Sequence, residues 1–409
     1  MLRPLLDRKS LVVLGMNSGT SADGLDLAAL RITRPTLGDS HRYRIRFLAG
    51  LTVRHPESLR RLIVRAADAP AGRVNDVILL DNLLGQYFGK AAASFMKKLS
   101  RQGITVDVVA SHGQTIRHLP KPINLAGHKV RGSMQIGSLA QIAAHTGRVV
   151  IGDFRQGDIA LGGEGAPITV AAMDKLFSHP VQTRLIVNVG GMSNYFYLPP
   201  QGSSARIRAA DCGPGNVLSD LLCQHLFDEP YDRNGHHATR GSISRRLSSI
   251  IMAYPFFSGK HRSTGREEFG EPMIRRMIAT GRKLNLGPDD LVATAMDITA
   301  TAIVLAVKPL VSSGNRKRDD RLYLTGGGSH NRFLKTRLSE RLPGVVVATV
   351  EDLGFDSDLV EASAYAVMGA STLWSRPMRT RFDGGTPRRQ AVLGVICQPP
   401  VEVMTRRRS

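Results

Sequence analysis

The chain has 409 residues, of which 42% are hydrophobic and 22% charged; these proportions exclude a collagen-like fibre, a coiled coil and extensive disorder, and they fit two or three folded domains. Lys and Arg number 55 and Asp and Glu 34, which gives a formal net charge of +21. A charge of this size suits an anionic partner such as a nucleic acid, a membrane surface, or a nucleotide or phosphate ligand.

Apolar runs typical of strands alternate along the chain with segments whose apolar residues recur every three to four positions, and this alternation predicts an α/β protein. The expected strands cover residues 11–15, 26–32, 43–53, 106–111, 149–152, 184–189, 195–198, 321–325 and 345–350. The expected helices begin at Pro56 and then cover 74–99, 138–145, 214–227, 242–254, 271–284, 288–312, 331–342 and 358–373.

The order of these elements repeats, because each half of the chain opens with a strand, a turn rich in Gly, Ser and Asn, and a second strand. We therefore expect two domains, residues 1–150 and 151–409. The helix near 358–373 is expected to pack back on the first domain.

Three glycine-rich turns follow predicted strands, and glycine there lets the backbone approach phosphate oxygens closely. The first turn, Gly15–Asp26, contains Asp23 and Asp26, whose oxygens suit Mg²⁺, although a tight hairpin would use the same residues for turn geometry. The second is Asn188–Asn194, and the third, Thr325–Asn331, opens a helix whose N-terminus favours anions. No Walker A or protein-kinase motif is present, so the three turns together predict a nucleotide-binding α/β protein of another kind.

The three cysteines, Cys212, Cys223 and Cys397, have neither the spacing of a disulfide framework nor that of a zinc site. The N-terminus lacks the apolar region of a signal peptide, and no run approaches the ~18 apolar residues of a membrane span. We therefore expect a soluble, cytoplasmic protein.

Taken in chain order, the motifs resemble those of the anhydro-N-acetylmuramic acid kinases, a family within the sugar kinase, Hsp70 and actin superfamily of two-domain ATPases. The chain departs from the usual pattern at Asn17, Ala22 and Cys212. The matching blocks are Ser18–Asp26, Ser111–His118, Gln135–Gly137, Gly152–Pro167, Asn188–Asn194, Asp211–Asp220, Asp232–Gly235, Ser263–Phe269, Thr325–Asn331 and Glu361–Ala362. The resemblance implies a two-domain actin-like ATPase fold, built from duplicated ribonuclease H-like domains with a cleft between them.

The resemblance also implies a reaction: ATP phosphorylates O6 of 1,6-anhydro-N-acetylmuramic acid while water opens the anhydro bridge at C1, in peptidoglycan recycling. The product is N-acetylmuramic acid 6-phosphate, the cofactors are ATP and Mg²⁺, and the enzyme is a cytoplasmic homodimer. The alternative is a related sugar or acid kinase of the same superfamily with another acceptor. No nucleic-acid or membrane partner is expected, since aromatic residues make up only 5% of the chain and the basic residues are scattered.

Asp153 matches the family's catalytic Asp, which acts as the general base on water, and it follows the strand 149–152, where sites in α/β sheets form. From the residues alone, a helix N-cap or an ion pair with Arg155 remains open for it. The nucleotide-binding residues implied by the resemblance are Gly19, Thr20, Ser21, Ala22, Asp23, Gly24, Leu25, Asp26, Asn188, Gly190, Gly191, Gly326, Gly327 and Gly328.

Four further residues are candidates for contact with the sugar: His112, Gln114, Arg155 and Glu361. The first two would equally satisfy buried backbone groups, and Glu361 would equally serve the helix dipole, since it opens the helix near 358–373. Arg155 would neutralise a phosphate or the lactyl carboxylate of the substrate. No metal ligands are assigned.

Overall fold

The computed structural model describes residues 2–35, 43–67, 73–201, 203–258, 269–311, 320–383 and 386–401. The chain divides into two compact units, which are described separately. The first unit contains Met1–Leu176, Glu361–Arg381 and Pro387–Ser409, and the second contains Phe177–Val360 and Phe382–Thr386. The division therefore falls later than the expected boundary at residue 150, and the helix after Val360 returns to the first unit.

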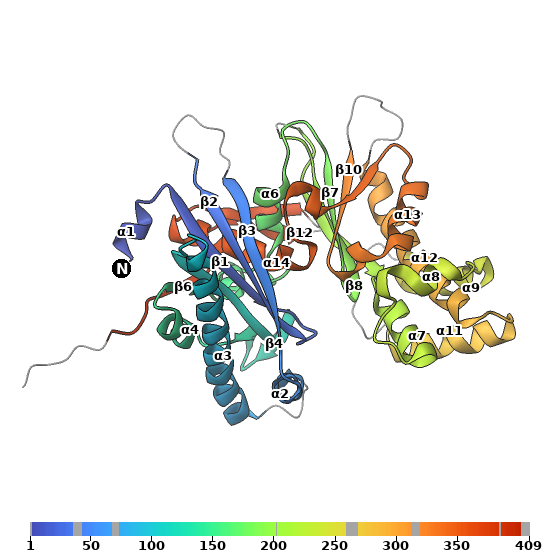
Figure 1. The fold of residues 1–409 in the computed structure, drawn as a ribbon, viewed down its shortest axis with the longest axis horizontal. Helices are drawn as coiled ribbons and strands as arrows, with labels where there is room; N and C mark the ends of the chain where they lie inside the picture. The colour runs from blue at the N-terminus through green and yellow to red at the C-terminus, as the bar shows by residue number, and fades with distance from the viewer. Residues whose placement is uncertain are drawn as a thin grey trace, which may run out of the picture. The chain divides into compact units, whose positions relative to one another are not determined.

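The first unit is built on a mixed sheet in the order β14-β6-β4-β1-β2-β3, with β5 paired to β4 (Figure 1). Strands β1 and β4 are parallel, as are β4 and β6, whereas β1, β2 and β3 form an antiparallel meander. The strands are β1 (Ser10–Ser18), β2 (Gly24–Thr33), β3 (Arg44–Arg54), β4 (Val108–Leu125), β5 (His128–Ile136), β6 (Val149–Gly152) and β14 (Val395–Cys397). The helices are α1 (Arg3–Leu6), α2 (Glu57–Ala67), α3 (Val74–Arg101), α4 (Leu139–Thr146), α5 (Phe154–Ala160), α6 (Val170–Phe177) and α14 (Val360–Leu373).

Strand β1 is buried on both faces, which explains its nearly continuous apolar sequence. Leu14 and Met16 point into the core that contains Phe88 of α3. The opposite face packs against α14 so closely that a Cβ on Gly15 would lie 1.9 Å from the carbonyl oxygen of Ala362. Glycine is therefore required at position 15, and the start of α14 is fixed against the carboxyl end of β1.

The second unit has a five-stranded sheet in the order β11-β10-β7-β8-β9. Its strands are β7 (Arg184–Val189), β8 (Met192–Leu198), β9 (Arg208–Pro214), β10 (Arg321–Thr325) and β11 (Val346–Thr349). Its helices include α7 (Val217–Phe227), α8 (His236–Arg240), α9 (Arg245–Met252), α10 (Pro255–Ser258), α11 (Glu271–Lys283), α12 (Pro288–Val307) and α13 (Arg332–Arg341), with short 3₁₀ turns η1 (Arg233–Gly235) and η3 (Gly327–His330). Strands β12 (Met378–Asp383) and β13 (Thr386–Ala391) form a separate pair.

Helix α12 lies in the core of the second unit, where it packs against strands β8 and β9 and the helices around it. Among the described residues, the segment Pro288–Leu310 has the length and mean hydropathy, 1.7, of a membrane-spanning helix, but 78% of its most apolar window is buried. Such burial is typical of the central helix of a folded domain.

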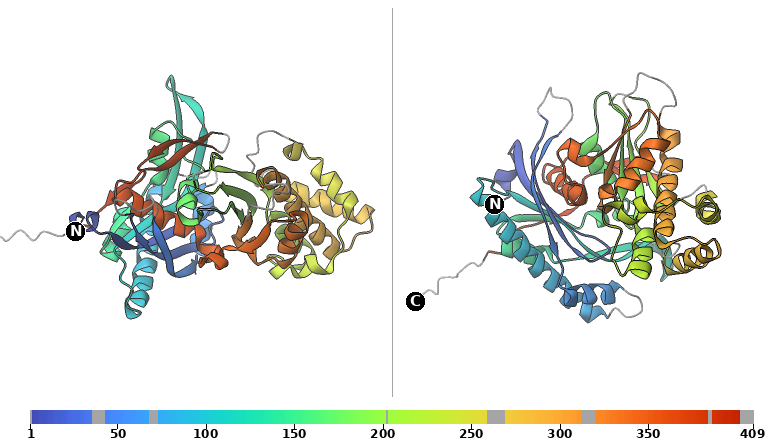
Figure 2. Two further views of the ribbon diagram at one scale, coloured as in Figure 1. Left: turned by 90° about the horizontal axis from the view of Figure 1, so that it is seen from above. Right: turned by 45° about the vertical axis from the view of Figure 1, so that its right-hand side comes forward.

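The α/β class is confirmed, and the predicted strands and helices are found with small shifts at their ends. Some boundaries were wrong by three residues or more. The expected helix 214–227 begins only at Val217, because Pro214 ends strand β9, and the expected helix 288–312 ends at Val307. The expected strand 106–111 is the buried start of β4, which continues to Leu125 and forms a long hairpin with β5. Figure 2 shows this hairpin, in teal, projecting from the first unit.

Candidate active site

Asp153 follows the last residue of β6, Gly152, at the carboxyl end of a buried parallel strand. Its backbone is left-handed, with φ 54° and ψ 42°, a conformation that non-glycine residues seldom adopt and that is concentrated at functional sites. Asp153 stands at the N-cap of α5, yet its side chain accepts no capping hydrogen bond. Within the part of the chain that the structure describes, its carboxylate has no ion pair with Arg155 either. Neither structural alternative is realised, so this carboxylate has no hydrogen-bond or ion-pair partner among the described residues, and its partial burial raises its pKa.

Arg155 fixes the protonation of His112. Its Nε donates a hydrogen bond to Nε2 of His112 over 3.0 Å, so that ring nitrogen must be unprotonated. The proton then lies on Nδ1, which is 3.2 Å from the carbonyl oxygen of Gly113. Burial and the charge of Arg155 lower the pKa of His112 to about 3, so this imidazole is neutral at neutral pH.

A stack of three rings supports the same arginine. The His112 ring lies 4.6 Å from the ring of Tyr365 at an angle of 23°, and the Tyr365 ring stacks in turn on Phe154 at 5.8 Å. The Tyr365 hydroxyl is hydrogen-bonded to Arg155, and Arg155 Nη1 donates to the carbonyl oxygen of Gly165 over 3.3 Å. The Arg155 guanidinium is thus held in place by these contacts, and Arg155 follows Asp153 by two positions in the sequence. The sequence-based prediction missed Tyr365, although it lies one helical turn after Glu361 on the same helix face.

Glu361 lies in the first turn of α14, beside the carboxyl end of β1. The Asn17 side chain donates from Nδ2 to Glu361 Oε2 over 2.8 Å. The Glu361 side chain is accessible to solvent, yet desolvation by the surrounding protein raises the pKa of its carboxyl, against the opposing effects of the Asn17 hydrogen bond and the charge of Arg155. The structure therefore brings Arg155, His112 and Glu361 together, and it adds Asn17.

Gln114 ties strand β4 to the first glycine-rich turn. Its Oε1 accepts a 2.6 Å hydrogen bond from Ser18 Oγ, and its Nε2 donates to the carbonyl oxygens of Gly19 and Thr115. His55 Nε2 lies 2.9 Å from the same Ser18 hydroxyl. Because these bonds use the Gln114 amide inside the protein, the geometry favours the structural alternative for this residue over a contact with the sugar.

The first turn joins β1 to β2. Ala22 and Leu25 are each 1% exposed, so their side chains belong to the core and a role in nucleotide binding would be limited to their backbone. A Cβ on Gly24 would lie 2.9 Å from a carbonyl oxygen of β3, so Gly24 allows close strand packing. Gly19, Thr20 and Ser21 are accessible, and they offer backbone N–H groups and hydroxyls.

The two acidic residues of this turn are engaged with neighbours. The Asp23 carboxylate lies 3.2 Å from Arg60 Nε, and Asp26 Oδ1 accepts a 2.6 Å hydrogen bond from Thr52. Across the described ranges no group of three or more His, Cys, Asp or Glu side chains is placed to hold a metal ion. These residues do not form a closed metal site.

The second and third turns lie side by side in the second unit. Strands β7 and β10 are parallel neighbours, with Asn188 aligned to Thr325, so the turns that follow them meet at one edge of the sheet. A Cβ on Gly326, where φ is +76°, would lie 2.5 Å from Asn188 Oδ1, and one on Gly328 would lie 2.4 Å from Val189. Both positions therefore require glycine.

A third segment completes this cluster of turns. The backbone N–H groups of Gly215 and Asn216 donate to the carbonyl oxygens of Gly191 and Gly190 over 2.9 and 2.8 Å. A Cβ on Gly190 or Gly327 would make only ordinary van der Waals contacts, at 3.7 Å from the Met192 carbonyl oxygen and 3.6 Å from Asn216 Nδ2, so close packing does not require glycine at these two positions. The sequence-based prediction did not include Gly215 or Asn216 among the site residues, although both belong to the matching block Asp211–Asp220.

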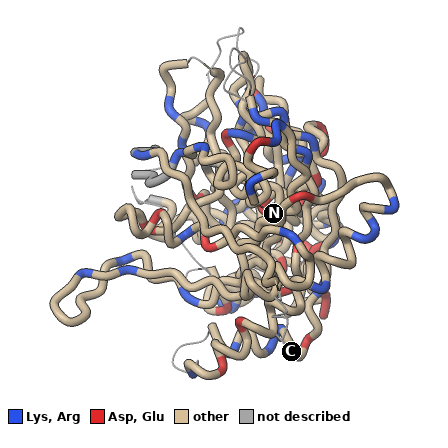
Figure 3. The backbone as a smooth tube through the Cα atoms, turned by 90° about the vertical axis from the view of Figure 1, so that its left-hand side faces the viewer, with Lys and Arg blue, Asp and Glu red and all other residues tan. Residues whose placement is uncertain are grey.

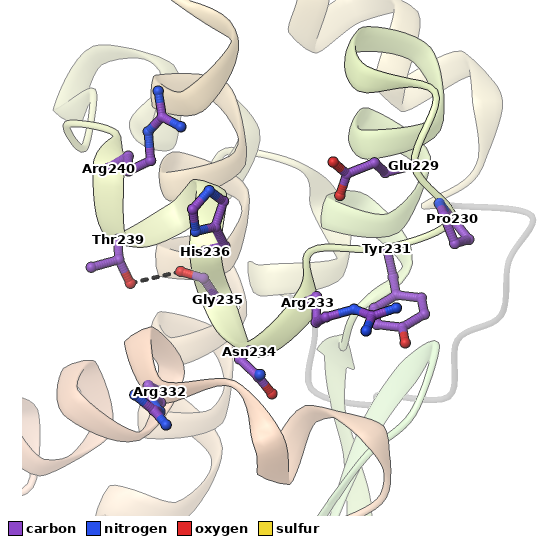
Figure 4. Close-up of a pocket in the computed structure, with 10 residues that line it drawn as sticks. All are labelled: Glu229, Pro230, Tyr231, Arg233, Asn234, Gly235, His236, Thr239, Arg240 and Arg332. Carbon is purple, nitrogen blue, oxygen red and sulfur yellow. Dashed lines mark hydrogen bonds between the residues drawn. The ribbon is translucent and has the colours of Figure 1, made fainter.

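A pocket of about 730 Å³ opens beside the third turn. Gly235 packs so closely against Asn331 that a Cβ on it would lie 2.5 Å from the amide oxygen, and this contact places η1 against the start of α13. Three arginines and one carboxylate lie in the lining, so the pocket is cationic (Figure 4). The lining residues are Glu229, Pro230, Tyr231, Arg233, Asn234, Gly235, His236, Thr239, Arg240 and Arg332.

Comparison with known proteins identifies the family. A model of the family described as anhydro-N-acetylmuramic acid kinase matches residues 11–399. The chain belongs to the anhydro-N-acetylmuramic acid kinase family. An anhydro-N-acetylmuramic acid kinase of Caldanaerobacter subterraneus subsp. tengcongensis is 33% identical over 372 residues, which cover 90% of this chain and 92% of the relative. One of Bacillus cereus is 32% identical over 394 residues, or 96% of this chain and 100% of the relative.

Solved structures with similar folds are more distant. They include the xylulose kinase of Lactobacillus acidophilus, with a TM-score of 0.38 and 9% identity over 89% of this chain and 96% of that one. The activator of 2-hydroxyisocaproyl-CoA dehydratase from Clostridium difficile has a TM-score of 0.37 and 11% identity over the same shares of the two chains. The sequence blocks that match the anhydro-N-acetylmuramic acid kinase family lie on the strands, helices and turns described above. Residues 263–268 of one block lie outside the described residues.

Proposed function

We propose that this kinase converts 1,6-anhydro-N-acetylmuramic acid to N-acetylmuramic acid 6-phosphate at the expense of ATP, in the recycling of peptidoglycan. The family match and the names of its relatives support the reaction. The observation that supports it most directly is the unengaged, partly buried carboxylate of Asp153 in a strained backbone position. A group held in this way is available to take a proton.

Asp153 is the proposed general base. It removes a proton from water as the water oxygen bonds to C1 of the sugar and the bond between C1 and O6 breaks. The freed O6 then bonds to the γ-phosphorus of ATP, and ADP leaves. A raised pKa suits this role, because a base is most effective when its pKa lies near the working pH.

Arg155 is proposed to recognise an anionic group of the substrate. The lactyl carboxylate of an anhydromuramic acid is the group that fits, because a guanidinium already oriented by His112, Tyr365 and Gly165 loses little freedom when it pairs. Glu361 is proposed to accept a hydrogen bond from a sugar hydroxyl. We assign Gln114 to the support of the first turn.

The glycine-rich turns are proposed to bind the nucleotide. Backbone N–H groups of Gly19 to Ser21 and of Gly191 would contact phosphates, whereas the N–H of Gly190 already donates to the carbonyl oxygen of Met192 over 3.1 Å. The cationic pocket beside Asn331 is proposed to take the adenosine end of ATP, with Arg233 and Arg332 near its polar groups. Mg²⁺ is proposed to enter with the phosphates and water as its main ligands, as is usual for this ion in kinases.

The enzyme is further proposed to be a cytoplasmic homodimer without nucleic-acid or membrane partners. Figure 3 shows Lys and Arg spread along the whole course of the backbone rather than gathered on one element. A charge distributed in this way would assist the capture of two anionic substrates.

An acceptor assay tests the proposal. Purified enzyme, ATP and Mg²⁺ are incubated with either 1,6-anhydro-N-acetylmuramic acid or N-acetylmuramic acid, and the products are identified by mass spectrometry. Phosphorylation of the anhydro sugar with gain of one water is expected. If only a sugar without the anhydro bridge is phosphorylated, the enzyme is instead a related kinase with another acceptor.

A further inference from the structure

Asn17 occupies an unusual place for a polar side chain. It lies at the carboxyl end of β1, where Gly15 and Asn17 face α14, and only 3% of its surface is exposed. Burial of an amide is unfavourable unless its polar atoms find partners. The partner of Nδ2 is Glu361 Oε2 at 2.8 Å.

The geometry of Glu361 depends on this contact. The close approach of Gly15 to Ala362 fixes the first turn of α14 against β1. The side chains of Asn17 on β1 and Glu361 on α14 are therefore held at a fixed spacing. Asn17 Nδ2 engages one carboxylate oxygen. Among the described residues, the other oxygen, Oε1, has no hydrogen-bond partner, and the side chain is open to solvent.

We infer that Asn17 is a positioning residue for the sugar site: its amide holds Glu361 Oε2 and so presents Glu361 Oε1 as the acceptor for a substrate hydroxyl. The inference rests on the proposed function, since it requires that the acceptor sugar binds beside Glu361. A hydrogen bond to an ionised acceptor is stronger than one between neutral groups, so its loss is expected to be measurable.

The contact also affects protonation. A hydrogen bond donated to the ionised carboxylate favours the charged form, so the Asn17 amide lowers the pKa of Glu361. The positive charge of Arg155 acts in the same direction, whereas desolvation by the surrounding protein raises it. Removal of the amide should therefore raise this pKa and weaken the acceptor at mildly acidic pH.

Asn17→Leu tests the inference, because leucine has nearly the shape of asparagine but cannot donate. We expect kcat/KM for the anhydro sugar to fall roughly tenfold or more, KM for ATP to stay within about twofold, and the acid limb of the pH profile to move to higher pH. Val13→Ala is the matched control, since Val13 is a fully buried residue on the same strand and face. It should lower stability without moving the pH profile.

A double-mutant cycle separates positioning from general damage. If Asn17 acts through Glu361, then Asn17→Leu should have little further effect in a Glu361→Gln background. Equal effects of Asn17→Leu in both backgrounds, or a pH profile identical to that of Val13→Ala, would overturn the inference. Failure of the proposed function would look different, because the unmodified enzyme itself would then not phosphorylate the anhydro sugar.

Discussion

Arg155 Nε lies 3.0 Å from His112 Nε2 and donates to it, so a buried neutral imidazole orients the guanidinium of the residue two positions after the candidate base. The interaction works only while His112 stays unprotonated, since a protonated ring would present an N–H to another cation. Its effect on stability follows from the difference in pKa between the folded and unfolded chains.

The His112 pKa predicts acid sensitivity. Below pH 6.5 the imidazole is protonated in the unfolded chain, whereas in the folded chain it stays neutral until the pH approaches about 3. The unfolded state therefore binds more protons in this window, and stability falls as the pH falls through it, by up to ~1.4 kcal/mol per pH unit. His112→Gln keeps an acceptor for Arg155 but does not titrate, so denaturant unfolding at several pH values should give it a shallower slope than the unmodified chain. Equal slopes would show that His112 does not titrate as described.

Asp153→Asn should abolish most turnover while leaving ATP binding intact. The amide has the same shape as the carboxylate but cannot accept the proton, and a positioned base typically contributes roughly 100-fold or more to the rate. Steady-state kinetics and ATP binding by calorimetry are the measurements. Near-normal turnover would remove Asp153 from its proposed role.

Gly15→Ala should separate α14 from β1. The added Cβ would lie 1.9 Å from the Ala362 carbonyl oxygen, so the helix must shift, at a cost of about 1–3 kcal/mol in stability. Because Glu361 lies at the start of that helix, kcat/KM for the sugar should fall as well. Gly132→Ala is the control, since a Cβ there meets nothing within 4 Å. If both variants unfold at the same denaturant concentration, the close packing at Gly15 is contradicted.

The cationic pocket gives a prediction for the nucleotide. Arg332→Ala should raise KM for ATP roughly tenfold, as expected for the loss of one charge-assisted hydrogen bond, and should leave KM for the sugar unchanged. Arg275→Ala, which removes a largely exposed arginine from α11, should change neither. If Arg332→Ala raised only the KM for the sugar, the pocket would belong to the sugar site and not to the nucleotide site.

Sequence periodicity predicted most of the fold, because buried strands and amphipathic helices leave strong apolar patterns. It missed the β4–β5 hairpin beyond residue 111, including the whole of β5. From Lys121 to Val130 the residues are exposed and leave no alternation of buried and exposed positions. Pro120 and Pro122 are also unfavourable for a strand, because proline cannot donate a backbone hydrogen bond, although an exposed edge tolerates it.

The site was predictable only in part. The resemblance indicated Asp153, but only the structure revealed its strained backbone and the absence of a capping bond. Tyr365 sits within an apolar helix and Asn17 near the start of the first glycine-rich turn, so neither residue type suggested a role. Their importance comes from contacts between segments more than 200 residues apart, as with Asn17 and Glu361, and no local pattern encodes such contacts.

Hydrolysis of the anhydro bridge and phosphoryl transfer are proposed to occur in one reaction. The most direct test is a short reaction in H₂¹⁸O, with the product analysed by fragmentation in a mass spectrometer against a control of N-acetylmuramic acid that corrects for exchange at C1. The account predicts one ¹⁸O at C1, above the control, and an unlabelled phosphate ester at O6. Label in the phosphate group, or a phosphorylated sugar with its anhydro bridge intact, would contradict it.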